Sequence, residues 1–279
     1  MAIGSRSTAP AAGKKSRAGS GKKQFQVELP RSAFRRLNRS AAVDSPQPSR
    51  DELAVRLQRF GLFSELPERV LMDLVAAACI RVYRTGEHVW HRGEQDAHAM
   101  FIESGFVKAA RRNADGVSRT YGLYGPGDSM GIFAIWAGMK YPTDAVAVSD
   151  GLSVIMVNSA AILKFAEKHP RLAEPLHKEM TRFADAFINK IEIVSAGTVP
   201  QRLAVMMAQL VDRYGVEKKG NQARLPMGLT LEQISEIVGA RLETVARTLG
   251  DWKRAGWLHI DSTGMHFARL DLVRALRPG

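Results

Sequence analysis

The spacing of hydrophobic positions divides the chain into stretches that predict different secondary structure. Residues 1–50 hold few large apolar side chains and many Gly, Ser, Pro and Lys, which is typical of a disordered tail. Residues 51–79 space their apolar positions as a helix does, whereas residues 80–157 alternate short β-like runs with Gly-containing turns. Beyond residue 170 the helical period returns. The pattern predicts an α+β chain with a sandwich or barrel between helices.

A long helix is predicted beyond residue 170, beginning near Pro175 because proline interrupts a helix interior. Its apolar positions step by three or four residues, as in a heptad repeat. These positions are Leu172, Leu176, Met180, Phe183, Phe187, Ile191 and Val194. By spacing alone, the stripe fits a seam between two chains and a stripe packed into the chain's own core equally well.

Residues 230–260 carry the most specific pattern of the chain. Thr230 and Gln233 have the spacing of a capping box, and Gly239 can adopt the left-handed conformation that ends a helix. A second helix is predicted from Leu242. Its expected inward-facing side chains are Val245, Leu249 and Trp252. Two short helices joined by a Gly turn are typical of a helix-turn-helix, whose second helix enters the DNA major groove.

The polar face of the second helix offers candidate base-reading residues. Glu243 and Arg247 are four residues apart and share that face. An Arg donates two hydrogen bonds to guanine, and a carboxylate accepts one from cytosine N4. The alternatives are a solvated salt bridge for this pair and, for the whole segment, a helical hairpin packed inside an enzyme.

Two short β runs follow the helix pair. Residues 256–260 and residues 265–267 flank the turn sequence Asp261-Ser262-Thr263-Gly264. A strand, a turn and a second strand at this place are interpreted as the wing of a winged helix. Residues 196–200 form the predicted hinge before this domain.

The positive charge lies at the two ends of the chain, whose formal net charge is +12. Residues 1–50 hold 11 basic and two acidic residues, residues 51–196 hold 17 and 18, and residues 197–279 hold 12 and eight. A basic tail beside a helix-turn-helix suggests attraction to a polyanion. The tail is either an inert segment or a non-specific DNA-binding arm.

Composition excludes several classes of protein. The single Cys79 excludes both a disulfide framework and a cysteine-ligated iron–sulfur cluster within one chain, and its apolar surroundings predict a buried thiol. No apolar run reaches ~18 residues, and the N-terminus lacks the apolar segment of a signal peptide. We therefore expect a cytoplasmic protein without membrane contact. No catalytic constellation, metal-ligand spacing or phosphate-binding loop stands out, so no enzymatic activity is predicted.

The order of these elements and their local motifs closely resembles the cyclic-AMP receptor and fumarate–nitrate regulator superfamily of bacterial transcription factors, over about residues 51–276. The motifs are Gly86-Glu87, Ser104-Gly105-Phe106-Val107-Lys108, Asp115-Gly116, Gly125-Pro126-Gly127-Asp128, and Gly239 followed by Glu243-Thr244-Val245-Ala246-Arg247. The resemblance implies a cyclic-nucleotide-binding-type β-roll sensor over residues 51–169, a dimerisation helix over 170–196 and a winged helix-turn-helix domain over 197–279.

The resemblance also implies partners: double-stranded DNA at the nucleoid, a second copy of the chain, and RNA polymerase. A homodimer favours the dimer-seam interpretation for Leu176, Met180, Phe183, Phe187, Ile191 and Val194, with two DNA-reading helices one DNA turn apart, ~34 Å.

By position, Glu243 and Arg247 match the family's base-reading pair. Leu242 stands where the cyclic-AMP receptor branch has a further reading Arg, and Leu contacts a thymine methyl instead. This favours a palindrome of the type TTGA–N6–TCAA. Arg241, Thr244 and Lys253 are predicted to contact phosphate, which positions the protein without specifying sequence.

The sensor departs from the family pattern. The family's phosphate-binding cassette has a Glu after its first Gly and, about ten residues later, an Arg that pairs with the phosphate. Here Ile132 follows Gly131, and the later stretch ends in Thr143 and Asp144 without an Arg. With Phe133, these residues outline a degenerate effector pocket. The absent charges argue against standard cyclic-AMP binding. We predict no cofactor, and the effector stays open.

Three histidines, His88, His91 and His98, lie in or near the early strands of the roll and keep haem sensing open. Residues i and i+3 of a strand point to opposite faces, so His88 and His91 are not expected to chelate a metal together. Ordinary surface or core histidines are the favoured interpretation, and no metal site is predicted.

Two other functions remain beside a sequence-specific regulator. The altered cassette is consistent with a small-molecule sensor whose winged helix contacts proteins. The basic tail is consistent with a weakly specific DNA-compacting protein.

Overall fold

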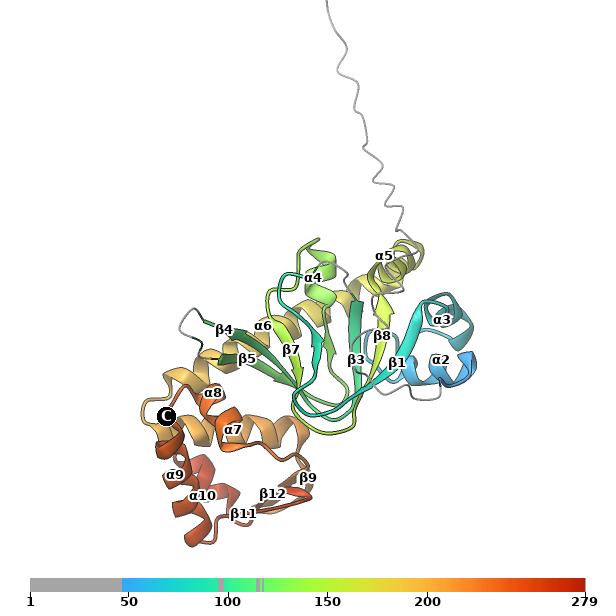
Figure 1. Cartoon of the computed structure of the whole chain (residues 1–279). Coiled ribbons are helices and arrows are strands. Elements are labelled where there is room, and N and C mark those ends of the chain that lie inside the picture. The colour runs from blue at the N-terminus through green and yellow to red at the C-terminus, as the bar shows by residue number, and fades with distance from the viewer. Residues whose placement is uncertain (1–46, 95–97, 114–115, 117, 279) are drawn as a thin grey trace, which may run out of the picture. The chain divides into compact units, whose positions relative to one another are not determined.

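The computed structural model of the chain describes residues 47–94, 98–113, 116 and 118–278 (Figure 1). The predicted tail lies outside these residues up to position 46, as does Asp115 of the roll motifs. Within the described residues, no helix is both long and apolar enough to cross a membrane.

Two helices precede the first strand. Helix α2 (Arg50–Gln58) begins where the Ser49 side chain accepts a hydrogen bond from the Glu52 backbone N–H, and α3 (Glu68–Val75) follows Pro67. The prediction of helix as far as residue 79 is wrong at its end. Strand β1 already starts at Ala78, because Ala78 and Cys79 pair with Val157 and Met156 on a strand far along the chain. Cys79 itself is half-buried on β1.

The predicted β-roll is confirmed as two four-stranded sheets, with the orders β1-β8-β3-β6 and β2-β7-β4-β5. Its strands are β1 (Ala78–Tyr83), β2 (His88–Trp90), β3 (His98–Ser104), β4 (Val107–Arg112), β5 (Ser118–Tyr124), β6 (Ser129–Met130), β7 (Asp144–Ala147) and β8 (Leu152–Asn158). Helix α4 (Ile132–Trp136) lies between β6 and β7 in sequence, and α5 (Ser159–Lys168) follows β8. Every pairing in both sheets is antiparallel.

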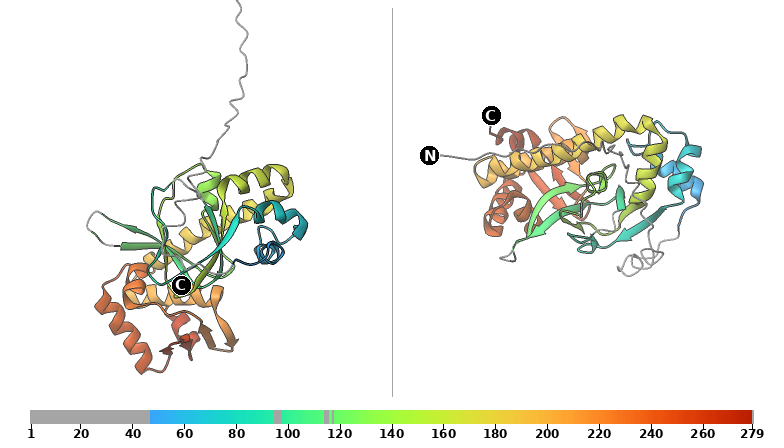
Figure 2. Two further views of the ribbon diagram at one scale, coloured as in Figure 1. Left: turned by 45° about the vertical axis from the view of Figure 1, so that its right-hand side comes forward. Right: turned by 90° about the horizontal axis from the view of Figure 1, so that it is seen from above.

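Helix α6 (Ala173–Ser195) follows a short 3-10 turn (Pro170–Leu172) and runs along the roll beside α4 and β5 (Figures 1 and 2). Its heptad stripe divides into two parts. Leu172 and Leu176 are buried among the residues of the roll and α2–α3, and Met180 packs against them. Farther along, the exposed apolar side chains are Phe187 (41% exposed), Ile188 (54%), Ile191 (60%) and Val194 (36%).

The C-terminal region packs four helices on a small sheet. Its helices are α7 (Val199–Tyr214), α8 (Leu231–Val238), α9 (Leu242–Arg254) and α10 (Leu270–Ala275). Its strands are β9 (Val216–Lys219), β10 (Gln222–Leu225), β11 (Leu258–Asp261) and β12 (Gly264–Phe267), in the sheet order β11-β12-β10-β9. The predicted wing is therefore confirmed as β11–β12, and β9–β10 extend it into a four-stranded sheet that the sequence pattern did not reveal.

Candidate nucleic-acid interface

Local interactions build the helix pair as predicted. The Thr230 side chain accepts a hydrogen bond from the Gln233 backbone N–H at 3.2 Å, and the Gln233 side chain accepts one from the Thr230 N–H at 2.9 Å. Gly239 ends α8 with a φ of +63°, where an L side chain would be strained. The capping box and the left-handed glycine thus fix where α8 begins and ends.

Helix α9 buries one face and exposes the other. Val245, Leu249 and Trp252 are at most 4% exposed, in the core shared with α7 and α8. On the opposite side Glu243 and Arg247 are exposed, and Leu242 is half-buried. Of the residues predicted to contact phosphate, Arg241 and Lys253 are exposed and Thr244 is half-buried.

The alternative of a Glu243–Arg247 salt bridge does not describe this surface. Among the ion pairs of the described residues, α9 contains Arg254–Asp251 and not Glu243–Arg247. Both side chains of the predicted base-reading pair are therefore available to another molecule.

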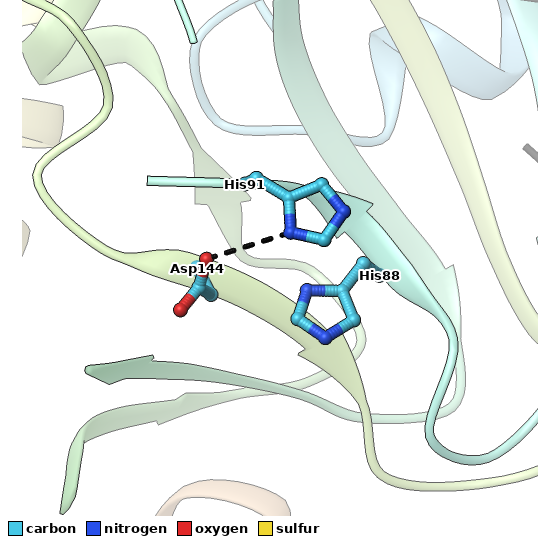
Figure 3. A group of neighbouring side chains, drawn as sticks. All are labelled: His88, His91 and Asp144. Carbon is cyan, nitrogen blue, oxygen red and sulfur yellow. Dashed lines mark ion pairs between the residues drawn. The ribbon is translucent and has the colours of Figure 1, made fainter. Parts of the chain in front are cut away.

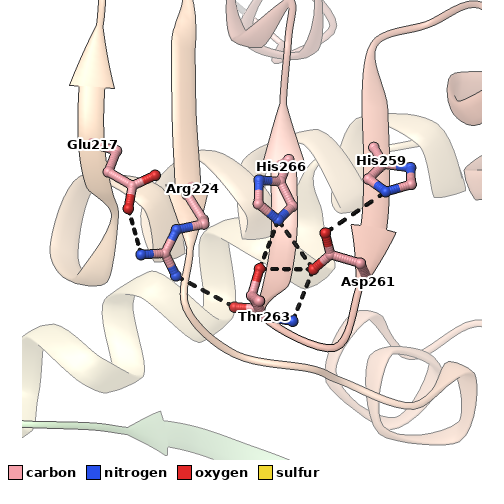
Figure 4. Close-up of polar contacts among 6 residues, drawn as sticks. All are labelled: Glu217, Arg224, His259, Asp261, Thr263 and His266. Carbon is pink, nitrogen blue, oxygen red and sulfur yellow. Dashed lines mark hydrogen bonds and ion pairs between the residues drawn. The ribbon is translucent and has the colours of Figure 1, made fainter.

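Asp261 organises the tip of the wing (Figure 4). Its Oδ1 accepts hydrogen bonds from the Thr263 hydroxyl at 2.7 Å and the Thr263 backbone N–H at 2.8 Å, and lies 3.1 Å from His266 Nε2. These Thr263 hydrogen bonds hold the pKa of Asp261 well below its usual range. Beside them, Arg224 pairs with Glu217 at 2.5 Å and donates to the Thr263 carbonyl. The turn between β11 and β12 is consequently tied to β9 and β10.

Three contacts join α8 to the roll and to α6. Glu236 of α8 accepts from Lys108 Nζ on β4 at 2.5 Å and from the Thr120 hydroxyl on β5 at 3.1 Å. Lys190 of α6 donates to the carbonyl oxygen of Ile237. Burial, reinforced by the charge of Arg119, lowers the pKa of Lys190 to about 8. The first helix of the pair is thus held by Lys108 and Thr120 of the roll and by Lys190 of α6.

Residues of the predicted effector pocket line a cavity between the roll and α6. Its volume is ≈ 70 Å³. Because a water molecule needs about 15 Å³ of such space, the cavity holds only a few waters. Gly131, Ile132, Phe133 and Thr143 line it as predicted.

The cassette residues pack closely against their own chain. The Phe133 ring stacks on Phe183 of α6 with centroids 4.3 Å apart, and Ile132, only 4% exposed, packs into the apolar core. Gly131 has a φ of +87°, and a Cβ there would lie 2.6 Å from the His98 carbonyl oxygen. The chain's own side chains thus occupy the cassette region.

The prediction that Asp144 belongs to this pocket is wrong. Asp144 is absent from the cavity lining, and its Oδ1 accepts a hydrogen bond from the Arg92 backbone N–H at 2.8 Å. Thr143, just before β7, reaches the cavity, whereas Asp144, the first residue of β7, contacts the turn after β2.

The pocket also has a charged wall that the sequence analysis missed. It is formed by Asp128, Glu179, Arg182 and Arg213. Asp128 pairs with Arg213 and accepts from the Tyr214 hydroxyl, both of α7, while buried Glu179 pairs with Arg182 at 2.6 Å. Asp128 and Arg213 are 85 positions apart, so no local pattern could have joined them.

The histidines of the roll are also arranged differently from the prediction. The rings of His88 and His91 stack with centroids 4.2 Å apart, and His91 Nδ1 lies 3.7 Å from Asp144 Oδ1 (Figure 3). The argument from strand alternation was wrong because the pairing of β2 with β7 has an irregularity between His88 and Trp90, and β2 ends at Trp90. Burial, followed by the neighbouring His91, lowers the pKa of His88.

Comparison with known proteins identifies both parts of the chain. Residues 80–169 match the cyclic nucleotide-binding domain, and residues 201–276 match the Crp-like helix-turn-helix domain. The CRP-like cAMP-activated global transcriptional regulator of Mycobacterium tuberculosis is 28% identical over 205 residues, which cover 74% of this chain and 91% of that protein. The fumarate and nitrate reduction regulatory protein of Salmonella typhi is 22% identical over 191 residues, or 68% and 75% of the two chains.

The fold agrees with solved structures. The structure of FixK2 from Bradyrhizobium japonicum aligns with a TM-score of 0.63 and 19% identity, covering 72% of this chain and 98% of that one. A sensor roll joined through a long helix to a winged helix-turn-helix defines a transcription regulator with a DNA-binding domain. The chain belongs to the Crp/Fnr family of these regulators.

Proposed function

We propose that the protein acts as a homodimer that reads a palindromic TTGA-type DNA site and does not depend on standard cyclic-AMP binding. The observation that carries the proposal is the two-sided character of α9. One face is anchored by Val245, Leu249 and Trp252, so the exposed face is presented on a rigid support.

Three side chains of α9 supply the base contacts. Arg247 donates a bidentate pair of hydrogen bonds to guanine, and Glu243 accepts from a cytosine amino group. Leu242 contacts a thymine methyl, which selects TTGA–N6–TCAA over sites with a guanine at that position. Arg241, Thr244 and Lys253 contact the flanking phosphates and set the position of the helix in the groove.

The exposed part of α6 supports dimerisation. Phe187, Ile188, Ile191 and Val194 leave an apolar surface at helical spacing on a helix whose Leu176 and Ile193 are buried in the chain's own core. Burying such a surface against an identical helix removes it from water, which is favourable. Leu176 lies within the chain's own core, so the proposed seam uses the later positions of the heptad stripe.

The cassette supports independence from cyclic AMP. Ile132 stands where the family has the Glu that binds the ribose, and its side chain is buried in the core. The cavity beside it is lined by Phe133, which stacks on Phe183, and its charged side chains Asp128 and Arg213 are paired with each other. The proposed regulator is therefore either controlled by a different effector or already poised to bind DNA, and RNA polymerase is its proposed downstream partner in the bacterial cytoplasm.

Fluorescence anisotropy tests the DNA-reading proposal. The full chain is titrated into a TTGA–N6–TCAA duplex and a scrambled duplex near physiological salt, without and then with cyclic AMP. We expect selective binding without nucleotide, unchanged by its addition. Lys168→Ala, which removes an exposed charge of the sensor domain paired with Asp73, is the control for general charge effects. Equal affinity for both duplexes would contradict sequence-specific reading. Weak DNA binding that cyclic AMP strengthens would contradict the proposed independence from cyclic AMP.

Sedimentation tests the dimer. We expect wild-type protein to sediment as a dimer and Ile191→Glu to sediment as a monomer, because a carboxylate would be buried at the seam. Leu163→Glu, at an exposed apolar position on α5, is the matched control. A dimer that persists in Ile191→Glu would place the interface elsewhere.

A further inference from the structure

We propose that His88, His91 and Asp144 bind a divalent transition-metal ion of the zinc class on the outer side of the roll. One donor atom from each residue lies within 4.8 Å of the others, and the cluster joins β2, the turn after it and β7 (Figure 3). Neither the DNA-reading helix nor the effector pocket contains any of these residues.

The donor set suits such an ion. Imidazole nitrogen and carboxylate oxygen are ordinary ligands of Zn²⁺, at about 2.0–2.2 Å, and tetrahedral coordination at that radius separates donors by about 3.4 Å. His91 Nδ1 and Asp144 Oδ1 are already 3.7 Å apart. Since both imidazoles are exposed, rotation of the rings closes the remaining separation without moving the backbone. Three protein ligands would leave a fourth position for water.

The backbone explains why two histidines three positions apart share one side of the sheet. The pairing of β2 with β7 matches His88 to Val146 and Trp90 to Ala145. Strand β2 therefore has one more residue than β7 over this stretch. An extra residue reverses the alternation of side chains along a strand. Trp90 is buried on the inner side, and His88 and His91 both reach the outer side.

The carboxylate is held in place for coordination. Asp144 Oδ1 accepts the Arg92 backbone N–H at 2.8 Å, a contact of the kind that orients metal-ligating carboxylates. Two further charged residues act on His88: Glu94, which is negative, and Arg112, which is positive. The one formal negative charge among the three donors is therefore available to the cation.

A metal at this position would connect the outer side of the roll with the pocket. Between the two histidines in sequence, Trp90 donates from Nε1 to the Thr143 carbonyl at 3.1 Å and stacks on Tyr141 with centroids 4.2 Å apart. Trp90, Tyr141 and Thr143 all line the cavity. An ion that clamps β2 to β7 would thus stiffen one wall of the cavity.

The test uses the untagged full chain, stripped of metal with a chelator. Zn²⁺ is titrated calorimetrically, and Co²⁺ is added separately to record the visible absorption of a four-coordinate site. We expect one Zn²⁺ per chain and a Co²⁺ spectrum of that type. His88→Ala, His91→Ala and Asp144→Asn should each weaken Zn²⁺ binding about tenfold or more and remove the Co²⁺ bands. Circular dichroism of each variant without metal verifies that it is folded.

Two controls separate this site from other donors. The double variant His259→Ala/His266→Ala removes the neighbouring imidazoles of the wing, whose centroids are 6.0 Å apart, and should bind Zn²⁺ as wild type does. Cys79→Ser removes the single thiol and should do the same. Wild-type protein that binds no Zn²⁺ would overturn the proposal, as would wild-type Zn²⁺ affinity in His88→Ala/His91→Ala.

Discussion

The helix-turn-helix pair and the degenerate cassette differ in how far the sequence alone determines them. In α8 and α9 the residues that make the surface lie within 24 positions of one another and are placed by caps and helical spacing. In the cassette the lining comes from β2, β4 to β6, α4, α6 and α7, so each residue's role depends on distant neighbours. A helical surface can therefore be predicted residue by residue, whereas a cavity shared by many elements cannot.

The largest expected effect tests the locally determined surface. Arg247→Ala should lose about 1–3 kcal/mol of binding free energy for each half-site, because a bidentate guanine contact disappears. Anisotropy on the palindrome and the scrambled duplex should show the two affinities converging. Retained selectivity would mean that Arg247 does not read bases and that the helical surface is less predictable than we infer.

The next effect tests the cassette. Ile132→Glu restores the family's acidic residue, but at a buried position without a partner, so we expect stability to fall by about 3 kcal/mol and cyclic AMP not to bind. Thermal unfolding and calorimetric titration with cyclic AMP measure both. Gain of nucleotide binding without loss of stability would show that the side chain at position 132 can point into the cavity. Local sequence would then determine ligand binding in this pocket too.

A smaller effect concerns Lys190, which links α6 to α8. The folded-state pKa of Lys190, about 8, lies below its unfolded value. The unfolded chain therefore binds more protons than the folded chain between about pH 8 and 10.5. The free energy of unfolding should consequently rise with pH across that window. Compared with Lys190→Met, wild type should gain about 1–3 kcal/mol from pH 8 to 10.5. Denaturant unfolding of both proteins at each pH provides the difference. A constant difference would show that Lys190 is solvated.

Glu236→Gln should have an effect of similar or smaller size. It removes the charge that pairs with Lys108, whose side chain is only 13% exposed, and we expect a loss of about 1–2 kcal/mol in stability. Glu167→Gln, at an exposed position of α5, should change stability by less than about 0.5 kcal/mol. Equal losses in the two variants would mean that α8 is not held by the sensor region.

The smallest expected effect distinguishes a phosphate contact, which positions the protein on DNA, from a base contact, which reads the sequence. Lys253→Ala should weaken binding to the palindrome and to the scrambled duplex equally, and should lower the salt dependence by about one counterion for each half-site. Anisotropy titrations at several salt concentrations measure both. A larger loss on the palindrome would assign Lys253 to base recognition.

The histidines of β2 show where local reasoning fails. Alternation predicted opposite faces for His88 and His91, yet the irregular pairing of β2 with β7 brings their rings into contact. The same holds for Cys79, which ends an apolar run of helical appearance but pairs as a strand with Met156. In both cases a partner strand more than 50 positions away decides the conformation.

Periodicity, caps and turn residues were enough to predict a β-sandwich or barrel between helices, the long helix, the helix pair, the wing and the exposed polar face of α9, and the resemblance specified the roll. These features depend on interactions within a few residues, as between Thr230 and Gln233. Only the tertiary structure decided which part of the α6 stripe is exposed, where Asp144 points, and that Lys108 meets Glu236 across 128 positions. Such contacts depend on how whole elements pack, which the spacing of residues within one element does not encode.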